Sequence, residues 1–131
     1  MLFQLKSLFV APLLVFPLIS ASLVTAEAAE VRVQLKEFHL EVSPLKVQAG
    51  KVRFIAVNRG EDEHELVVSI QKNGKYEEID EIEPFPPGVS KDLILNLPAG
   101  DYELSCQVVE VEEGETEDHY KKGMHVKFKV N

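Results

Sequence analysis

Short stretches in which apolar and polar residues alternate recur along the chain from residue 31 to its end. Near the start, Val31, Val33 and Leu35 alternate with polar residues, and near the end, Val126, Phe128 and Val130 do the same. A period of two residues is typical of β-strands with one buried face. The same pattern predicts further strands at residues 51–58, 64–70, 93–97 and 101–108.

Turn signals separate these stretches. Asn58-Arg59-Gly60, Asn73-Gly74 and Pro98-Ala99-Gly100-Asp101 are typical turn sequences, and a hairpin is predicted at Asn73-Gly74. The apolar parity switches after Leu35, which predicts a bulge or kink in one strand near Glu37.

Residues 76–88 lack a clear alternation and contain three prolines, which cannot donate hydrogen bonds within a sheet. We therefore expect a long connection between sheet edges there, and not a central strand. About seven to eight short strands with one crossover and no long helix predict an all-β fold. The predicted architecture is a Greek-key antiparallel β-sandwich.

The first 26 residues have the pattern of a cleaved export signal. Lys6 precedes the apolar run Ser7–Ile19, and small residues end at Ala26, with Ala28 as a second cleavage position. The alternative is an uncleaved membrane anchor, but the run is shorter than the roughly 20 residues that span a bilayer. Pro12 and Pro17 also interrupt it. We expect residues 1–26 to be removed, residues 27–131 to form one domain, and the protein to be periplasmic or secreted.

Without the signal, 105 residues remain, with 13 basic and 22 acidic side chains. This length fits a single core. The negative charge argues against binding to nucleic acid or anionic lipid, and no other stretch could span a membrane. We expect a monomer.

Cys106 is the only cysteine, so it cannot form an internal disulfide. A free thiol in an oxidising compartment is a liability, so Cys106 is expected to be either buried and inert or bound to a ligand. Its neighbours favour binding, because His119 and Met124 lie in the same C-terminal stretch.

The strand parity predicts which of these side chains can converge. Cys106 and Met124 fall on the core face of their strands, and His64 begins the core face of a middle strand. By contrast, His39 and His125 share a face with charged residues and are expected to be exposed. A thiolate, two imidazoles and a thioether are the ligand types of copper electron-transfer sites.

The sequence here resembles the cupredoxins, the blue copper proteins. The matching stretches are Asn58 to Gly60 leading to His64-Glu65-Leu66, Pro98 to Cys106, and His119 to Met124 with Gly123 before the methionine. The resemblance implies that His64, Cys106 and His119 are equatorial ligands of one copper ion that cycles between Cu(I) and Cu(II), and that Met124 is the axial ligand. It also implies a supporting role for Asn58.

One feature departs from the family pattern. Twelve residues, Gln107 to Asp118, separate Cys106 from His119, where cupredoxins usually have only a few. Extra loop length costs little entropy, on the order of 1 kcal/mol, so the site need not be lost. A carboxylate of the insert could still replace a ligand or admit water; the candidates are Glu110, Glu117 and Asp118.

The insert is strongly acidic and has nearly the pattern of a small hairpin. It is either a solvated loop or a docking patch, at residues 110–118, for a basic redox partner. Whether Glu65 touches the site is left open by the sequence.

These features favour an exported one-electron carrier. The alternatives are a copper storage or delivery protein and a metal-free interaction module. No catalytic motif is recognisable, so an enzyme is not expected.

Overall fold

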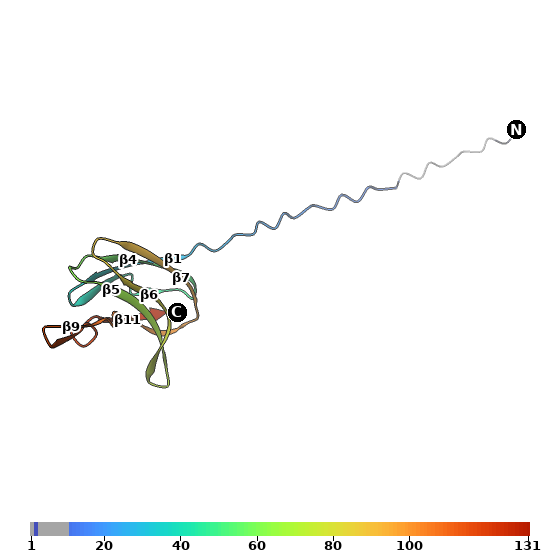
Figure 1. Cartoon of the computed structure of the whole chain (residues 1–131). Helices are drawn as coiled ribbons and strands as arrows, with labels where there is room; N and C mark the ends of the chain where they lie inside the picture. The colour runs from blue at the N-terminus through green and yellow to red at the C-terminus, as the bar shows by residue number, and fades with distance from the viewer. Residues whose placement is uncertain (1, 3–10) are drawn as a thin grey trace.

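The computed structural model describes residue 2 and residues 11–131, so Lys6 and the first part of the predicted signal run lie outside the described residues. Residues 11–28 have no regular secondary structure and extend away from the folded part of the chain (Figure 1). No helix that could cross a membrane occurs among the described residues.

The folded part consists of strands, and eleven are found within residues 29–130. They are β1 (Ala29–Lys36), β2 (His39–Ser43), β3 (Lys46–Val47), β4 (Gly50–Asn58), β5 (His64–Lys72), β6 (Lys75–Phe85), β7 (Ser90–Leu97), β8 (Gly100–Ser105), β9 (Val109–Glu112), β10 (Glu115–Asp118) and β11 (His125–Val130).

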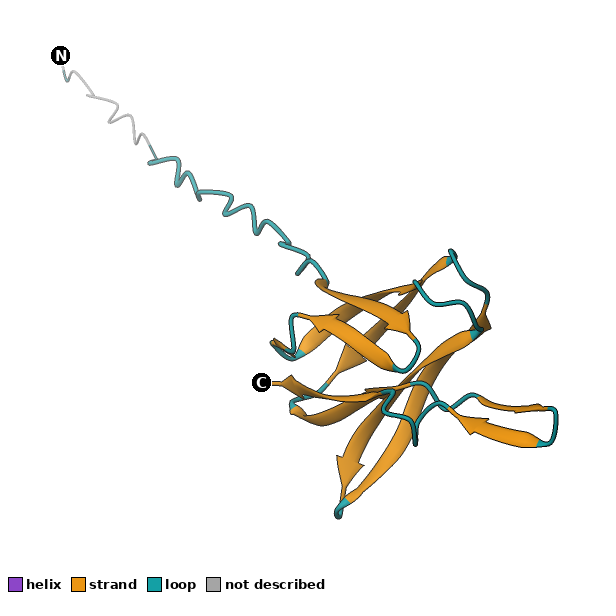
Figure 2. Ribbon diagram, turned by 90° about the vertical axis from the view of Figure 1, so that its left-hand side faces the viewer, coloured by secondary structure: helices purple, strands orange, loops and turns teal. Residues whose placement is uncertain are grey.

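Two sheets pack face to face as a sandwich (Figure 2). One has the order β2-β1-β4-β7 and the other β3-β11-β8-β5-β6, while β9 and β10 form a separate two-stranded hairpin. This confirms the predicted all-β sandwich. Most pairings are antiparallel, but β1 pairs with β4 and β3 pairs with β11 in parallel. The chain leaves the first sheet after β2, crosses to the other sheet as β3, and returns as β4 in the direction of β1.

The core between the sheets is built from the predicted alternating positions. Val31, Val33 and Leu35 of β1 are fully buried, and Phe54 of β4 contacts Phe128 of β11 edge to face, with ring centroids 5.6 Å apart. Since aromatic and branched side chains fill this interior, the two sheets form a rigid frame.

Two expectations need correction. The parity switch near Glu37 is a hairpin turn between β1 and β2, and not a bulge within one strand, because Lys36 pairs directly with His39. Residues 76–88 are also not simply a connection. Most of them form β6, which pairs with β5 at the edge of its sheet, and the crossing to β7 begins only after Phe85. An edge strand tolerates Pro84, as expected for a residue without an N–H donor.

The hairpin at Asn73-Gly74 is confirmed, since both residues have positive φ and join β5 to β6. The acidic insert forms a second hairpin, β9–β10, with a similar turn at Glu113-Gly114. It projects from the sandwich (Figure 2).

Candidate metal centre

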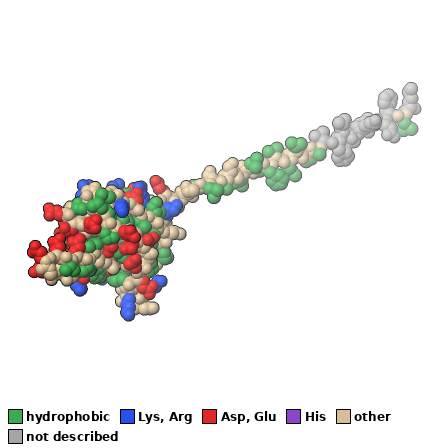
Figure 3. Space-filling view, viewed as in Figure 1, with side chains coloured by type: hydrophobic (Ala, Val, Ile, Leu, Met, Phe, Trp, Pro, Cys, Tyr) green, Lys and Arg blue, Asp and Glu red, His purple; other side chains and the backbone are tan. Residues whose placement is uncertain are grey.

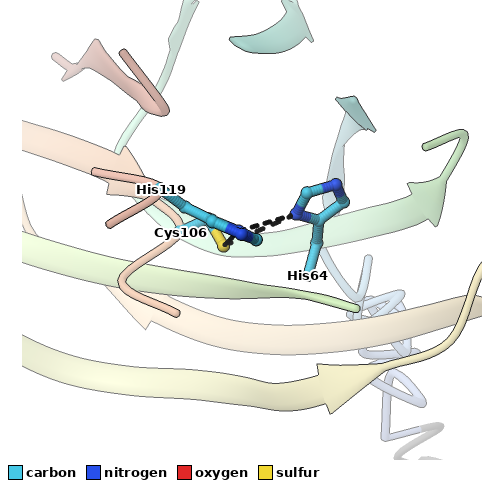
Figure 4. Close-up of side chains that lie close together, drawn as sticks. All are labelled: His64, Cys106 and His119. Atoms are coloured by element: carbon cyan, nitrogen blue, oxygen red, sulfur yellow. Dashed lines mark hydrogen bonds between the residues drawn. The ribbon is translucent and has the colours of Figure 1, made fainter. Parts of the chain in front are cut away.

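Three of the four predicted ligands converge at one end of the sandwich (Figure 4). His64 is the first residue of β5, Cys106 follows the last residue of β8, and His119 follows β10. β5 and β8 are neighbouring antiparallel strands, so the start of one lies beside the end of the other. All three side chains are fully buried.

The three donor atoms form a compact triangle. His64 Nδ1 and His119 Nδ1 are 3.2 Å apart, and Cys106 Sγ lies 3.8 Å from the first and 3.6 Å from the second. The point equidistant from three atoms at these separations lies about 2.1 Å from each, which fits the roughly 2.0–2.3 Å of imidazole and thiolate bonds to a small divalent metal. The donor set and its spacing therefore fit a metal ion.

Met124 is placed beside this triangle by its backbone. The Cys106 N–H donates to the Met124 carbonyl at 3.0 Å, and the Met124 N–H donates to the His119 carbonyl at 3.1 Å. The Met124 side chain is fully buried. These contacts place the residue next to both predicted ligands, and the axial role of its sulfur stays a prediction.

The long insert does not separate Cys106 from His119. The His119 N–H donates to the Val108 carbonyl at 3.0 Å, directly beneath the β9–β10 pair Val109 and Asp118. This hydrogen bond closes the hairpin at its base. His119 is therefore bonded to a residue only two positions after Cys106, although the insert separates them in sequence. This explains how a loop of this length keeps two donors together.

Burial shifts the pKa of two of the three donors when no metal is bound. It raises the pKa of the Cys106 thiol, and it lowers the pKa of His119, with the neighbouring His64 adding to that effect. A metal that binds here must therefore displace the thiol proton, and its affinity is expected to be coupled to pH.

Glu37 is a site residue that the sequence prediction missed. His64 Nε2 and Glu37 Oε1 lie 2.7 Å apart, within hydrogen-bonding distance. Burial of the carboxylate raises its pKa, but hydrogen bonds from backbone N–H groups, chiefly that of Asp62, and from His64 outweigh this and lower the pKa to about 2. Glu37 is therefore ionised at neutral pH.

Glu65 touches the site through its backbone. Its N–H points at Cys106 Sγ, 3.5 Å away, and its carboxylate accepts a hydrogen bond from the Gln107 N–H at 2.8 Å. Burial raises the pKa of this carboxyl. Glu65 thus contacts the sulfur and holds the backbone of the residue after Cys106, which answers the question that the sequence left open.

The carboxylates of the insert lie outside the triangle. Among the described residues, Glu117 and Asp62 form a second group of donors with His119, and Glu117 is already paired with Lys122 at 2.7 Å. Asp118 accepts from the Lys121 N–H at 3.0 Å. Glu110 belongs to neither group of potential ligands. That one of these carboxylates replaces a ligand stays a prediction.

The other two histidines are exposed, as predicted. His39 lies 3.4 Å from Glu41, and the His125 ring stacks on Tyr120. Asn58, for which a supporting role was predicted, is fully buried, and its amide holds the loop that precedes His64.

The fold and the three buried side chains define a small all-β protein with a cluster of sulfur and nitrogen donors. The family model described as a cupredoxin-like domain matches residues 8–115, and the chain belongs to this family. The match ends before His119 and Met124, and the structure places His119 with the other two donors. No curated protein matches.

Solved structures with similar folds include auracyanins from photosynthetic bacteria. Reduced auracyanin from Roseiflexus castenholzii superposes with a TM-score of 0.62 at 14% identity, covering 81% of this chain and 99% of that one. Auracyanin A from Chloroflexus aurantiacus, described as a "blue" copper protein, gives 0.61 at 17% identity, covering 80% and 100%. At these identities the likeness establishes the fold.

Proposed function

We propose that this cupredoxin-like protein is a one-electron carrier that binds a single copper ion and is not an enzyme. The observation that carries the proposal is the buried triangle of His64, Cys106 and His119. Copper bound there would supply a one-electron couple between Cu(I) and Cu(II). The proposed ligands are His64, Cys106, His119 and Met124.

The protein's own residues contribute a fixed geometry. The donors lie at the ends of β5 and β8 and beside β11, and backbone hydrogen bonds link Cys106, Met124 and His119 to one another. A frame that does not rearrange suits both oxidation states, because it keeps the structural change on electron transfer small. The full burial of the donors also favours a carrier over a delivery protein, whose ligands must be reached by an acceptor.

The test is an optical titration of residues 27–131 with Cu(II) under anaerobic conditions. We expect an intense visible thiolate-to-copper band that reaches its end point at one equivalent. Ascorbate should bleach the band and ferricyanide should restore it. A protein that shows no such band, or that yields its copper at once to a mild chelator, would not be this carrier.

The acidic hairpin supports a docking site for a basic redox partner. A cleft of 360 Å³ lies between Asp62 and the β9–β10 hairpin, and acidic side chains gather at this end of the molecule (Figure 3). Besides Thr116 and Lys122, its lining is acidic: Asp62, Glu110, Glu112, Glu113, Glu115 and Glu117. Because His119 lies next to Asp62 and Glu117, a cationic partner in this cleft would approach the metal ligand directly.

Electron exchange with a cationic reagent is therefore expected to slow as salt is added, because screening weakens long-range attraction. Stopped-flow reduction of the Cu(II) protein by hexaammineruthenium(II), a cationic reductant, measures this. Neutralising Glu112, Glu113 and Glu115 with glutamine should flatten the salt dependence. The control neutralises Glu77, Asp80 and Asp101, which removes the same charge from exposed residues that do not line the cleft and should retain the slope. Equal slopes in both variants would remove the hairpin from docking.

Export stays part of the proposal. The apolar run ends shortly before β1, which begins at Ala29 beside both predicted cleavage positions. We propose that residues 1–26 are a cleaved signal, that residues 27–131 form the single mature domain, and that this domain acts in the periplasm or outside the cell as a monomer. Mass spectrometry of the exported protein should find Glu27 or Ala29 as its first residue, and an intact N-terminus would contradict cleavage.

A further inference from the structure

From the contact between Glu37 and His64, we infer that Glu37 is a positioning residue that fixes the tautomer of His64 and strengthens it as a metal ligand. The inference rests on the proposed copper function and goes beyond the ligand set. Glu37 accepts the hydrogen bond from His64 Nε2 at 2.7 Å, while the opposite nitrogen, Nδ1, faces Cys106 and His119.

The fold holds this carboxylate firmly. Oxygen Oε1 of Glu37 accepts three hydrogen bonds, from His64 Nε2 and from the backbone N–H groups of Glu61 and Asp62, the latter two at 2.9 Å each. Three donors on one oxygen leave the carboxylate little freedom.

Gly60 makes room for the carboxylate. A Cβ atom at this position would overlap the Glu37 side chain, so any residue with a side chain would displace it. The β1–β2 turn that carries Glu37 is itself fixed to the same loop, because β1 and β4 pair in parallel up to Leu35 and Asn58 and the Arg59 N–H donates to the Leu35 carbonyl at 2.8 Å. Two segments distant in sequence thus meet to build one contact.

The chemical consequence follows from the ionised carboxylate, which can only accept a hydrogen bond. His64 must carry its proton on Nε2, so the lone pair of Nδ1 is free and directed at the other donors. An anionic acceptor also pushes electron density into the imidazole, and carboxylate partners of this kind orient metal-binding histidines and raise their basicity.

Glu37 acts on only one of the two histidines. His119 Nε2 is buried and has no hydrogen-bond partner among the described residues, whereas His64 Nε2 has a charged one. A stronger imidazole donor stabilises the more highly charged Cu(II), so Glu37 is expected to lower the reduction potential.

Three variants separate the roles of charge and geometry. Glu37→Gln retains a carbonyl oxygen for the three donors but removes the charge, and Glu37→Ala removes both. Glu61→Gln is the matched control, because it removes a neighbouring exposed charge while its backbone N–H stays in place. Thermal melts of the apo proteins establish that each variant folds.

The first measurement needs no metal. Long-range ¹⁵N–¹H spectra of the apo protein should show His64 as the Nε2–H tautomer in the wild type and in Glu37→Gln, and a tautomer mixture in Glu37→Ala. An unchanged tautomer in Glu37→Ala would overturn the positioning role.

The second measurement follows Cu(II) and Cu(I) affinity by competition with chelators, and the potential by voltammetry. Glu37→Ala is expected to weaken Cu(II) binding about 10–100-fold. If Glu37→Gln loses tenfold in Cu(II) affinity with Cu(I) affinity unchanged, its potential rises by about 59 mV. Glu61→Gln should match the wild type.

If the wild type binds copper and all three variants bind it equally well at one potential, the inference fails while the proposed function stands. If the wild type binds no copper, the proposed function fails.

Discussion

Replacing Cys106 with serine is expected to abolish the visible band completely while the protein stays folded. The band requires electron transfer from a thiolate to Cu(II), and a serine hydroxyl is a hard, poorly reducing donor that does not ionise at neutral pH. Cu(I), which prefers soft ligands, should lose more affinity than Cu(II). The loss should exceed the roughly 10–100-fold that removal of a supporting group costs, because a direct ligand is gone.

The apo form of Cys106→Ser should melt only modestly below the wild type. The new hydroxyl is buried, but the Glu65 N–H that points at the sulfur can donate to it, so the cost is about 1 kcal/mol rather than that of an unpaired polar group. The matched control is Ser105→Ala. Ser105 is equally buried, yet its hydroxyl contacts the Gln107 side chain, so its band should be unchanged. Full colour in Cys106→Ser would exclude the sulfur as a ligand.

The candidate site was predictable from the sequence where strand parity determined it. A two-residue period states which face a side chain occupies, and this placed Cys106 and Met124 inside and His125 outside. The position of His64 at the start of a strand could also be predicted, because it depends only on the alternation of the residues that follow it. The hairpin pattern of the insert was also visible, because alternation and a glycine turn need only neighbouring residues.

Glu37 could not be found in this way, because its contact with His64 depends on which strands pair. The parallel pairing of β1 with β4 brings the β1–β2 turn to the loop before β5, and nothing in the alternation of either strand specifies that partner. The parity switch near Glu37 was a usable signal, but a bulge and a tight hairpin turn produce the same switch. Gly60 was a second signal. A side chain at this position would overlap Glu37, so the need for glycine becomes clear only once the two residues are known to be in contact.

The burial of Glu103 shows the same limit on the opposite face of β8. Parity predicts this face to be exposed, yet Glu103 is 6% exposed because the Tyr120 hydroxyl donates to its carboxylate. Tyr120 belongs to the segment that follows the insert. Where a long loop folds back over a strand, alternation alone underestimates burial.

Asn58→Ala is expected to lower the free energy of unfolding by about 3 kcal/mol or more and to weaken metal binding as well. Asn58 is fully buried, its Nδ2 donates to the Asp62 and Phe85 carbonyls at 2.8 and 2.9 Å, and its Oδ1 accepts from the Gly60 N–H at 2.9 Å. Truncation leaves three backbone groups without a partner, each costing about 1–3 kcal/mol when it is shielded from water. A loss of 3 kcal/mol corresponds to a melting temperature lower by roughly 10–20 °C.

The effect should reach the metal because the same loop supports Glu37. Asn58 stabilises the turn in which the Glu61 and Asp62 N–H groups donate to the Glu37 carboxylate. If this loop loosens, Glu37 no longer fixes the ring orientation of His64. Asn58→Asp has the same shape and keeps the acceptor for Gly60, but it turns an oxygen toward two carbonyls and buries a charge. It should therefore be at least as destabilising at neutral pH.

Asn96→Ala, at an exposed asparagine of β7, is the control and should stay within about 0.5 kcal/mol of the wild type. Urea unfolding and copper competition measure both effects, and an Asn58→Ala protein as stable as Asn96→Ala would show that the loop does not depend on this amide.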